Sequence, residues 1–301
     1  MAAQRPVVRE PGVGGRTKSM GWHLERRLWQ GLVVVILCTV GVFLMVPFYW
    51  MVATSLKVES EVYRFPPVWI PSRLAWENYY YALIEIMPFP TFFANTLHIT
   101  VFSTVGAVLS SSMVAFAFAR LRWPGRDKLF VVILATMMVP SYSTIVPVFI
   151  LFRMLNWIDT FKPLIVPSWC GGAFFIFLMR QFYMTLPLDL DEAARMDGAS
   201  DWRIWWSVIM PLARPAVATV AIYNFMDKWN EFFGPLIFLT SLRKFTVALG
   251  LNMFRVAAAS YGVRYHWLMA ASVAVLLPCL LVFFFAQKTF IQGVVMSGIK
   301  G

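Results

Sequence analysis

The chain has 301 residues, of which 59% are hydrophobic and only 14% are charged. Soluble domains carry about a quarter charged residues, so this composition argues against a soluble globular protein. In a soluble protein the net charge of +11 would point to a nucleic-acid partner. Here the excess lies in the N-terminal tail and in short segments between apolar stretches, so we attribute it to orientation in a membrane and expect no nucleic acid.

The three cysteines lie in apolar stretches and the three histidines are scattered, so we expect no disulfide framework and no metal site.

Six apolar stretches are long enough to cross a bilayer, which takes about 20 residues of helix. In chain order they cover 28–52, 92–119, 129–152, 163–183, 213–239 and 267–288. We therefore predict an all-α, polytopic membrane protein with six transmembrane helices. Its expected parts are a basic cytoplasmic tail (1–27), a first helix with its outer loop (28–91), a core transmembrane domain (92–292) and a cytoplasmic C-terminal tail (293–301).

The distribution of Lys and Arg predicts the orientation of these helices. More of them lie in the tail and in the even-numbered connections than in the odd-numbered ones. Because cytoplasmic segments carry the excess of Lys and Arg, we expect both termini in the cytoplasm.

The segment 184–212, between the fourth and fifth stretches, predicts two short helices. The first is expected to end at Gly198, and Ser200 is suited to cap the second, which ends at Pro211. Acidic side chains favour the positive end of a helix dipole; those at the start of the first helix are Asp189, Asp191 and Glu192. Two such helices would make a compact docking knob. The alternative is an ordinary connection lying on the membrane surface, which Trp202, Trp205 and Trp206 also suit.

The same segment resembles the EAA loop of binding-protein-dependent ABC importer permeases. Glu192-Ala193-Ala194 is followed by Gly198 and then by Val208-Ile209-Met210-Pro211. The usual pattern ends in Ile-x-Leu-Pro, and Val208 and Met210 keep its apolar character. Within that superfamily the chain is similar to the maltose-type carbohydrate permeases. Further stretches that support the resemblance are Thr54-Ser55-Leu56-Lys57, 65–79, Phe93-Ala94-Asn95-Thr96-Leu97, Trp229-Asn230-Glu231-Phe232, Gly293 and 297–301.

This resemblance implies a type I ABC importer permease fold and a sugar-transport subunit rather than an enzyme, without catalytic residues. The loop would seat in an ATP-binding subunit, with Glu192 as the anchoring charge and Gly198 as the turn between the two helices. The expected contact residues are Glu192, Ala193, Ala194, Asp197, Gly198 and Pro211. No cofactor is expected on this chain, because ATP and Mg would be bound by the partner. The resemblance also implies a location in the cytoplasmic (inner) membrane of a bacterium or archaeon. The implied partners are a second homologous permease, two ATP-binding subunits, an extracytoplasmic solute-binding protein, a sugar and membrane lipid.

The fifth apolar stretch contains polar residues that are costly in contact with lipid. They are expected on one helix face, directed into the bundle or onto the translocation path, and Lys228 and Glu231 are spaced to pair. One interpretation is that they bind sugar hydroxyls, with Trp229 or Tyr223 stacking on a pyranose. The other is that they pair with the second permease. The candidate residues for both are Asn224, Asp227, Lys228, Trp229, Asn230 and Glu231.

Two other classes of protein remain as alternatives. In an ion-coupled secondary transporter, Asp227 and Glu231 would be ion sites, although such carriers usually show an internal repeat. A membrane-embedded enzyme acting on lipid-linked substrates would need clustered acids at one membrane face. The acids at 189–192 offer only a weak version of that pattern.

Overall fold

The computed structural model describes residues 19–261 and 264–298, and all regular structure within these ranges is helical. The all-α prediction is therefore confirmed. The chain divides into two compact units, 1–50 and 51–301, which are described separately.

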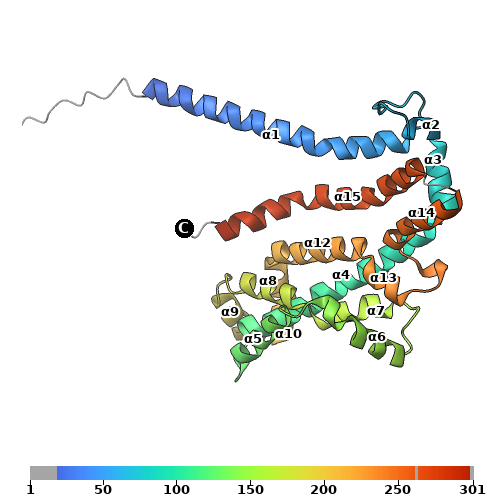
Figure 1. Ribbon diagram of the computed structural model, residues 1–301. Coiled ribbons are helices and arrows are strands. Elements are labelled where there is room, and N and C mark those ends of the chain that lie inside the picture. The colour runs from blue at the N-terminus through green and yellow to red at the C-terminus, as the bar shows by residue number, and fades with distance from the viewer. Residues whose placement is uncertain (1–18, 262–263, 299–301) are drawn as a thin grey trace, which may run out of the picture. The chain divides into compact units, whose positions relative to one another are not determined.

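The first unit consists of most of helix α1 (Ser19–Ser55), drawn in blue in Figure 1. Its part from Glu25 to Ser55 has 31 residues and is apolar enough to cross a membrane. At about 1.5 Å per residue this length exceeds the hydrocarbon core of a bilayer. The first predicted span lies within this helix. The basic residues at 5–18 of the expected tail lie outside the described residues.

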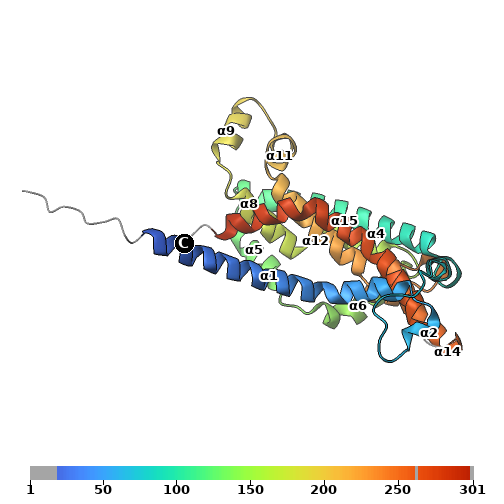
Figure 2. The same cartoon turned by 90° about the horizontal axis from the view of Figure 1, so that it is seen from above.

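The second unit is built around α4 (Phe89–Arg120). Helices α8 (Ala173–Tyr183) and α12 (Arg214–Asn230) pack along it, and α15 (Tyr265–Gly298) packs against α12 (Figures 1 and 2). The C-terminal tail expected from residue 293 is largely the end of α15. The other elements near α4 and α15 are α2 (Glu59–Val62), α3 (Glu77–Tyr80), the π-helical η1 (Tyr81–Ile86), η5 (Leu242–Lys244) and α14 (Val247–Tyr261).

One close contact of α4 requires a glycine. A Cβ at Gly106 would overlap the indole of Trp169, in the 3-10 helix η3 (Val166–Cys170). One turn further along α4, the hydroxyl of Ser110 donates to the carbonyl of Ser168 at 3.2 Å. Small residues allow this kind of close approach between membrane segments. Together with α7 (Lys162–Ile165) and α8, η3 forms a 22-residue helical segment that is long and apolar enough to cross a membrane. This agrees with the span predicted for 163–183.

The third predicted span is not one continuous helix, and this expectation needs correction. The structure has α5 (Arg126–Thr136), a turn, the 3-10 helix η2 (Ser141–Thr144) and α6 (Ile145–Met154). The turn contains Pro140, which disfavours helical geometry at the preceding residue and has no N–H to donate. With 11 and 10 residues, each helix is about 16 Å long, too short to cross the hydrocarbon core alone.

The fifth predicted span is also broken. Helix α12 ends at Asn230, and α13 (Phe233–Phe238) follows. The break comes at Glu231, which has extended backbone, so the helix ends before Gly234 and Pro235. Before α12 the chain bends by 82° from the helical segment Asp201–Leu212. By length and composition, the described residues contain four helices that could cross a membrane, or five if this bent pair is one span.

Three clusters of buried apolar side chains hold the second unit together. One lies at the C-terminal end of α4 and joins it to α5, α8, α12 and the segment 204–213. A second joins α4, η1, α12, α14 and α15 around Trp229, and a third joins α4 to α6, α7 and α13 around Phe152 and Phe238. The first cluster therefore joins apolar side chains of the segment with the EAA pattern and of α4 in one buried core.

Candidate functional site

The segment 184–212, here called the knob, forms two short helical pieces joined by a sharp turn. The first is α9 (Asp189–Met196), with three carboxylates in its opening turn. The turn is at Gly198, whose φ of 80° is left-handed, a conformation that costs little only for glycine. The hydroxyl of Ser200 then caps the second piece by accepting from the N–H of Arg203 at 3.4 Å. The predicted helix stop and helix cap are both confirmed.

The second piece runs through α10 (Asp201–Arg203), the π-helical η4 (Ile204–Ile209) and α11 (Met210–Leu212). Figure 2 shows α9 and α11 projecting to one side of α8. An ion pair between Arg195 and Asp201, at 2.6 Å, ties the two pieces together. The knob therefore has a defined shape of its own.

Most of the contact residues expected from the motif are accessible on the knob. Glu192, Ala193, Asp197, Gly198 and Pro211 are exposed. Large apolar side chains beside them are exposed too: Leu188, Met196, Trp202 and Trp206. Ala194 is the exception, since it is half-buried and packs against the apolar cluster beneath. Large exposed apolar side chains beside exposed carboxylates are typical of a protein-binding surface.

The inner side of the knob is fixed by an arginine that the sequence patterns did not single out. Arg120 ends α4, and its guanidinium donates to the carbonyl of Leu186 at 3.0 Å and lies 3.6 Å from the carboxylate of Asp191. Burial raises the pKa of Asp191, against the opposing effect of Arg120 and then Arg195. A basic residue at a helix C-terminus is too common for the sequence to reveal this contact.

The polar residues of α12 lie near its C-terminal end. Lys228 lies 3.2 Å from Asp227 and 3.7 Å from Glu231, so the predicted pairing of Lys228 with Glu231 is confirmed. The carboxylate of Glu231 also accepts from the N–H of Gly234 at 3.0 Å, across the helix break. The side chain of Asp227 is 62% exposed, and Asn230 is exposed as well.

Two members of this predicted group point into the chain's own interior. Trp229 is 1% exposed, donates to the carbonyl of Val275 at 3.2 Å and stacks on Phe225. Asn224 is buried and accepts from the hydroxyl of Thr104 at 3.2 Å. Trp229 therefore cannot stack on a sugar ring in this arrangement. Tyr223, Asp227 and Asn230 are the exposed residues on this part of the helix.

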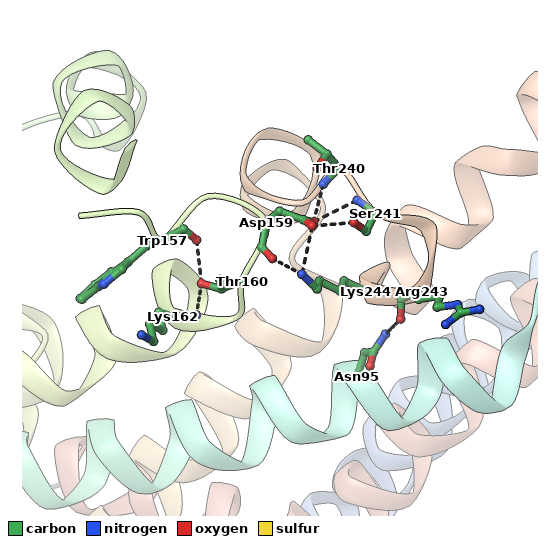
Figure 3. Close-up of polar contacts among 9 residues, drawn as sticks. All are labelled: Asn95, Trp157, Asp159, Thr160, Lys162, Thr240, Ser241, Arg243 and Lys244. Atoms are coloured by element: carbon green, nitrogen blue, oxygen red, sulfur yellow. Dashed lines mark hydrogen bonds and ion pairs between the residues drawn. The ribbon is translucent and has the colours of Figure 1, made fainter. Parts of the chain in front are cut away.

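Near the N-terminal end of α4, a polar junction joins two segments that are distant in sequence (Figure 3). The carboxylate of Asp159 accepts from the N–H groups of Thr240 at 3.0 Å and Ser241 at 2.9 Å, from the Ser241 hydroxyl at 2.5 Å and from Lys244 at 3.0 Å. Lys244 also donates to the Asp159 carbonyl. The hydroxyl and N–H of Ser241 hold the pKa of Asp159 well below its usual range. We call these four residues the Asp159 junction.

Two stretches that supported the resemblance also hold loop segments in place, and one of them holds the loop of the Asp159 junction. The amide of Asn95 donates to the carbonyl of Arg243 at 2.8 Å (Figure 3) and to that of Phe245 at 3.0 Å. The amide of Asn78 is buried and donates to the carbonyls of Ser55 at 2.9 Å and Lys57 at 2.8 Å. The stretches at 54–57 and 77–79 are therefore in direct contact, which their separation in sequence did not reveal.

The sequence matches the family described as binding-protein-dependent transport system inner membrane component, over residues 106–295. The chain belongs to this family. The match includes the whole knob and α12, so the resemblance seen in the EAA pattern is confirmed. The chain has the all-α fold of a multi-pass membrane protein, with helices long and apolar enough to span a bilayer.

Several curated relatives align along nearly the whole chain. An arabinooligosaccharide transport system permease, AraQ of Halalkalibacterium halodurans, is 32% identical over 85% of this chain and 91% of its own length. A diacetylchitobiose uptake permease, NgcG of Streptomyces coelicolor, is 32% identical over 86% of this chain and 84% of its own. The lactose transport permease LacG of Rhizobium radiobacter is 29% identical, with coverage of 91% and 98%.

A solved structure has the same fold. A crystal structure of a bacterial ABC transporter involved in the import of the acidic polysaccharide alginate matches with a TM-score of 0.77 and 25% identity, over 88% of this chain and 97% of that chain. The predicted ABC importer permease fold is therefore confirmed.

Proposed function

We propose that this chain is a transmembrane permease subunit of an ATP-driven sugar importer. It forms half of the translocation path, and a second homologous permease forms the other half. The relatives that suggest a carbohydrate cargo are named as permeases for arabinooligosaccharides, diacetylchitobiose and lactose. A solute-binding protein delivers the sugar, and two ATP-binding subunits drive the cycle.

The observation that carries the proposal is the shape and accessibility of the knob. It offers an exposed carboxylate, Glu192, next to the small side chain of Ala193 and the exposed apolar side chain of Met196. Small residues let a partner approach the backbone closely, and a fixed charge selects one orientation. The knob therefore docks in a cleft of an ATP-binding subunit, which performs the hydrolysis that this chain does not.

This assignment also sets the orientation of the chain. The knob and both termini lie in the cytoplasm, in agreement with the excess of Lys and Arg on that side. The loop that Asp159 and Asn95 both hold then lies on the outer side, where the solute-binding protein docks. Within the membrane, the exposed side chains of Tyr223, Asp227 and Asn230 face the second permease or the sugar path, because lipid would not solvate a carboxylate.

The proposal is tested first by purifying the chain from its native membrane in mild detergent and identifying co-purifying proteins by peptide mass spectrometry. We expect an ATP-binding subunit and a second permease with an EAA loop. The solute-binding protein is then screened with arabinooligosaccharides, diacetylchitobiose and lactose. Uptake into proteoliposomes should require ATP and withstand an ionophore. A chain that purifies alone, or uptake that needs an ion gradient and no ATP, would overturn the proposal.

The docking role of the knob has its own test. Glu192→Lys reverses an exposed charge, so we expect it to abolish ATP-dependent uptake while the chain still inserts in the membrane. Asp189→Lys places the same charge change on the same helix and outside the motif, and it should retain most of the uptake. Normal uptake by Glu192→Lys would contradict the docking role.

A further inference from the structure

Arg120 is the most completely buried charge near the knob. Its side chain is 1% exposed, and that of its partner Asp191 is 7% exposed. The guanidinium reaches three groups of the knob: it donates to the carbonyls of Leu186 at 3.0 Å and Pro187 at 3.5 Å, and it lies 3.6 Å from the Asp191 carboxylate. One residue at the end of α4 is thus attached both to the start of the knob and to its first helix.

The two charges of this buried ion pair depend on each other for stability. Desolvation of each charge is costly, and removing one partner leaves the other uncompensated. Within the described residues, Nε of Arg120 and Oδ1 of Asp191 have no hydrogen-bond partner. The carboxylate is therefore held by the charge of Arg120, together with the more distant Arg195, rather than by a saturated hydrogen-bond network.

The position of this pair matters because of the way the chain is connected. The knob continues along the chain into α8 on one side and α12 on the other, whereas α4 is distant in sequence. Yet α4 is the helix on which both α8 and α12 pack. Phe116 and Phe118 of α4 also belong to the same buried apolar cluster as Ile204, Trp205 and Ile209 of η4. Apolar packing is non-directional, whereas the bonds of Arg120 fix one register between α4 and the knob.

We propose that Arg120 and Asp191 are positioning residues that lock the knob to α4, so that a displacement of α9 moves α4 with it. This inference rests on the proposed function, since it supplies the route by which force from an ATP-binding subunit reaches the centre of the permease. Coupling between sites requires such an element, whose state both sites influence. Without the pair, α9 still docks but moves relative to α4.

The test uses the complete importer in lipid nanodiscs, with Mg-ATP and vanadate as the probes. Spin labels are placed at Met196, which is 88% exposed on α9, and at Arg122, which is exposed just beyond α4, in a chain whose native cysteines are replaced. In the parent chain the distance between the labels stays the same in the nucleotide-free and vanadate-trapped states. In Asp191→Asn it changes between the two states.

A second readout is ATP hydrolysis in proteoliposomes. We expect Asp191→Asn to reduce the stimulation of hydrolysis by the solute-binding protein about fivefold or more, in the range of ordinary coupling free energies, while the ATP-binding subunit still co-purifies. Arg120→Lys keeps the charge but loses the fork of donors that reaches two carbonyls, so it should show an intermediate loss. Asp189→Asn changes an exposed carboxylate on the same helix and is the matched control, with stimulation unchanged.

The pair also predicts non-additivity. Because the two residues act through each other, Arg120→Met combined with Asp191→Asn should lose no more stimulation than the more affected single variant. Additive losses, an unchanged label distance in Asp191→Asn, or loss of the ATP-binding subunit from that variant would each overturn the inference. A wild-type complex that neither hydrolyses ATP nor transports sugar would instead overturn the proposed function, which separates the two failures.

Discussion

The carboxylate of Asp159 accepts from both the N–H and the hydroxyl of Ser241, across 82 residues of sequence. This contact closes the loop after α13 onto the turn before α7. Asp159 itself has a left-handed φ of 58°, which Asp tolerates better than most residues. The turn and the side chain thus fasten the loop together.

Asp159→Ala should loosen the loop at 240–246. The substitution removes the acceptor shared by the N–H groups of Thr240 and Ser241 and the ammonium of Lys244. Because the Thr240 and Ser241 bonds are exposed, water replaces the lost acceptor, and the cost is the net contribution of each bond, about 0.5–1.5 kcal/mol. Hydrogen exchange measured by mass spectrometry should speed up in peptides covering 240–246. The control is Ser241→Ala, which removes only the hydroxyl bond and should have a smaller effect. Unchanged exchange in both variants would show that the junction contributes nothing to the order of the loop.

The same junction should be insensitive to mild acid. The pKa of Asp159 is lowered in the folded chain, so its contribution to stability is fully present above the unfolded value of about 3.9 and is lost as the pH falls through the lower folded value. The melting midpoint of the wild type should exceed that of Asp159→Asn by a constant margin from neutral pH to about pH 4. The margin should narrow only at lower pH. A margin that shrinks near neutral pH would contradict the lowered pKa.

Gly198 should tolerate Asn better than Ala. A Cβ at this position would meet no described atom within 4 Å, so any cost comes from the left-handed backbone, at about 1–2 kcal/mol for most residues. Asn adopts this conformation more readily than Ala. We expect ATP-dependent uptake to fall in the order Gly, Asn, Ala. Equal uptake by the Asn and Ala variants would show that the backbone conformation of the turn does not limit transport.

Trp229 should matter for stability rather than for sugar affinity. Its ring is buried between Phe93 and Phe225, so Trp229→Ala is expected to cost about 3–5 kcal/mol, the usual range for a large buried aromatic. Trp229→Phe keeps most of the packing and loses the bond to Val275, with a smaller cost. Thermal unfolding in detergent gives the stability, and uptake at several sugar concentrations gives the KM. A raised KM at unchanged stability would contradict this expectation and indicate that Trp229 contacts the sugar.

Amino-acid sequence alone determined the class of this protein. Long apolar runs can satisfy their backbone groups in lipid only as helices. The order Glu192-Ala193-Ala194, Gly198 and Pro211 is a local pattern that can be recognised without knowledge of the fold. The helix stop at Gly198 and the cap at Ser200 are local for the same reason, since both depend on the backbone within a few residues. The pairing of Lys228 with Glu231 follows from helix geometry.

Tertiary structure decided the rest, because it depends on contacts between residues far apart in the chain. Hydropathy cannot show that the run at 129–152 breaks near Pro140, since transmembrane helices also tolerate proline when neighbours satisfy the freed groups. The burial of Trp229 depends on Val275 and Phe93, which pack around it from other helices. In the sequence, Arg120 is indistinguishable from other basic residues at the membrane boundary. Only the folded chain places Asp191 and the carbonyl of Leu186 beside its side chain.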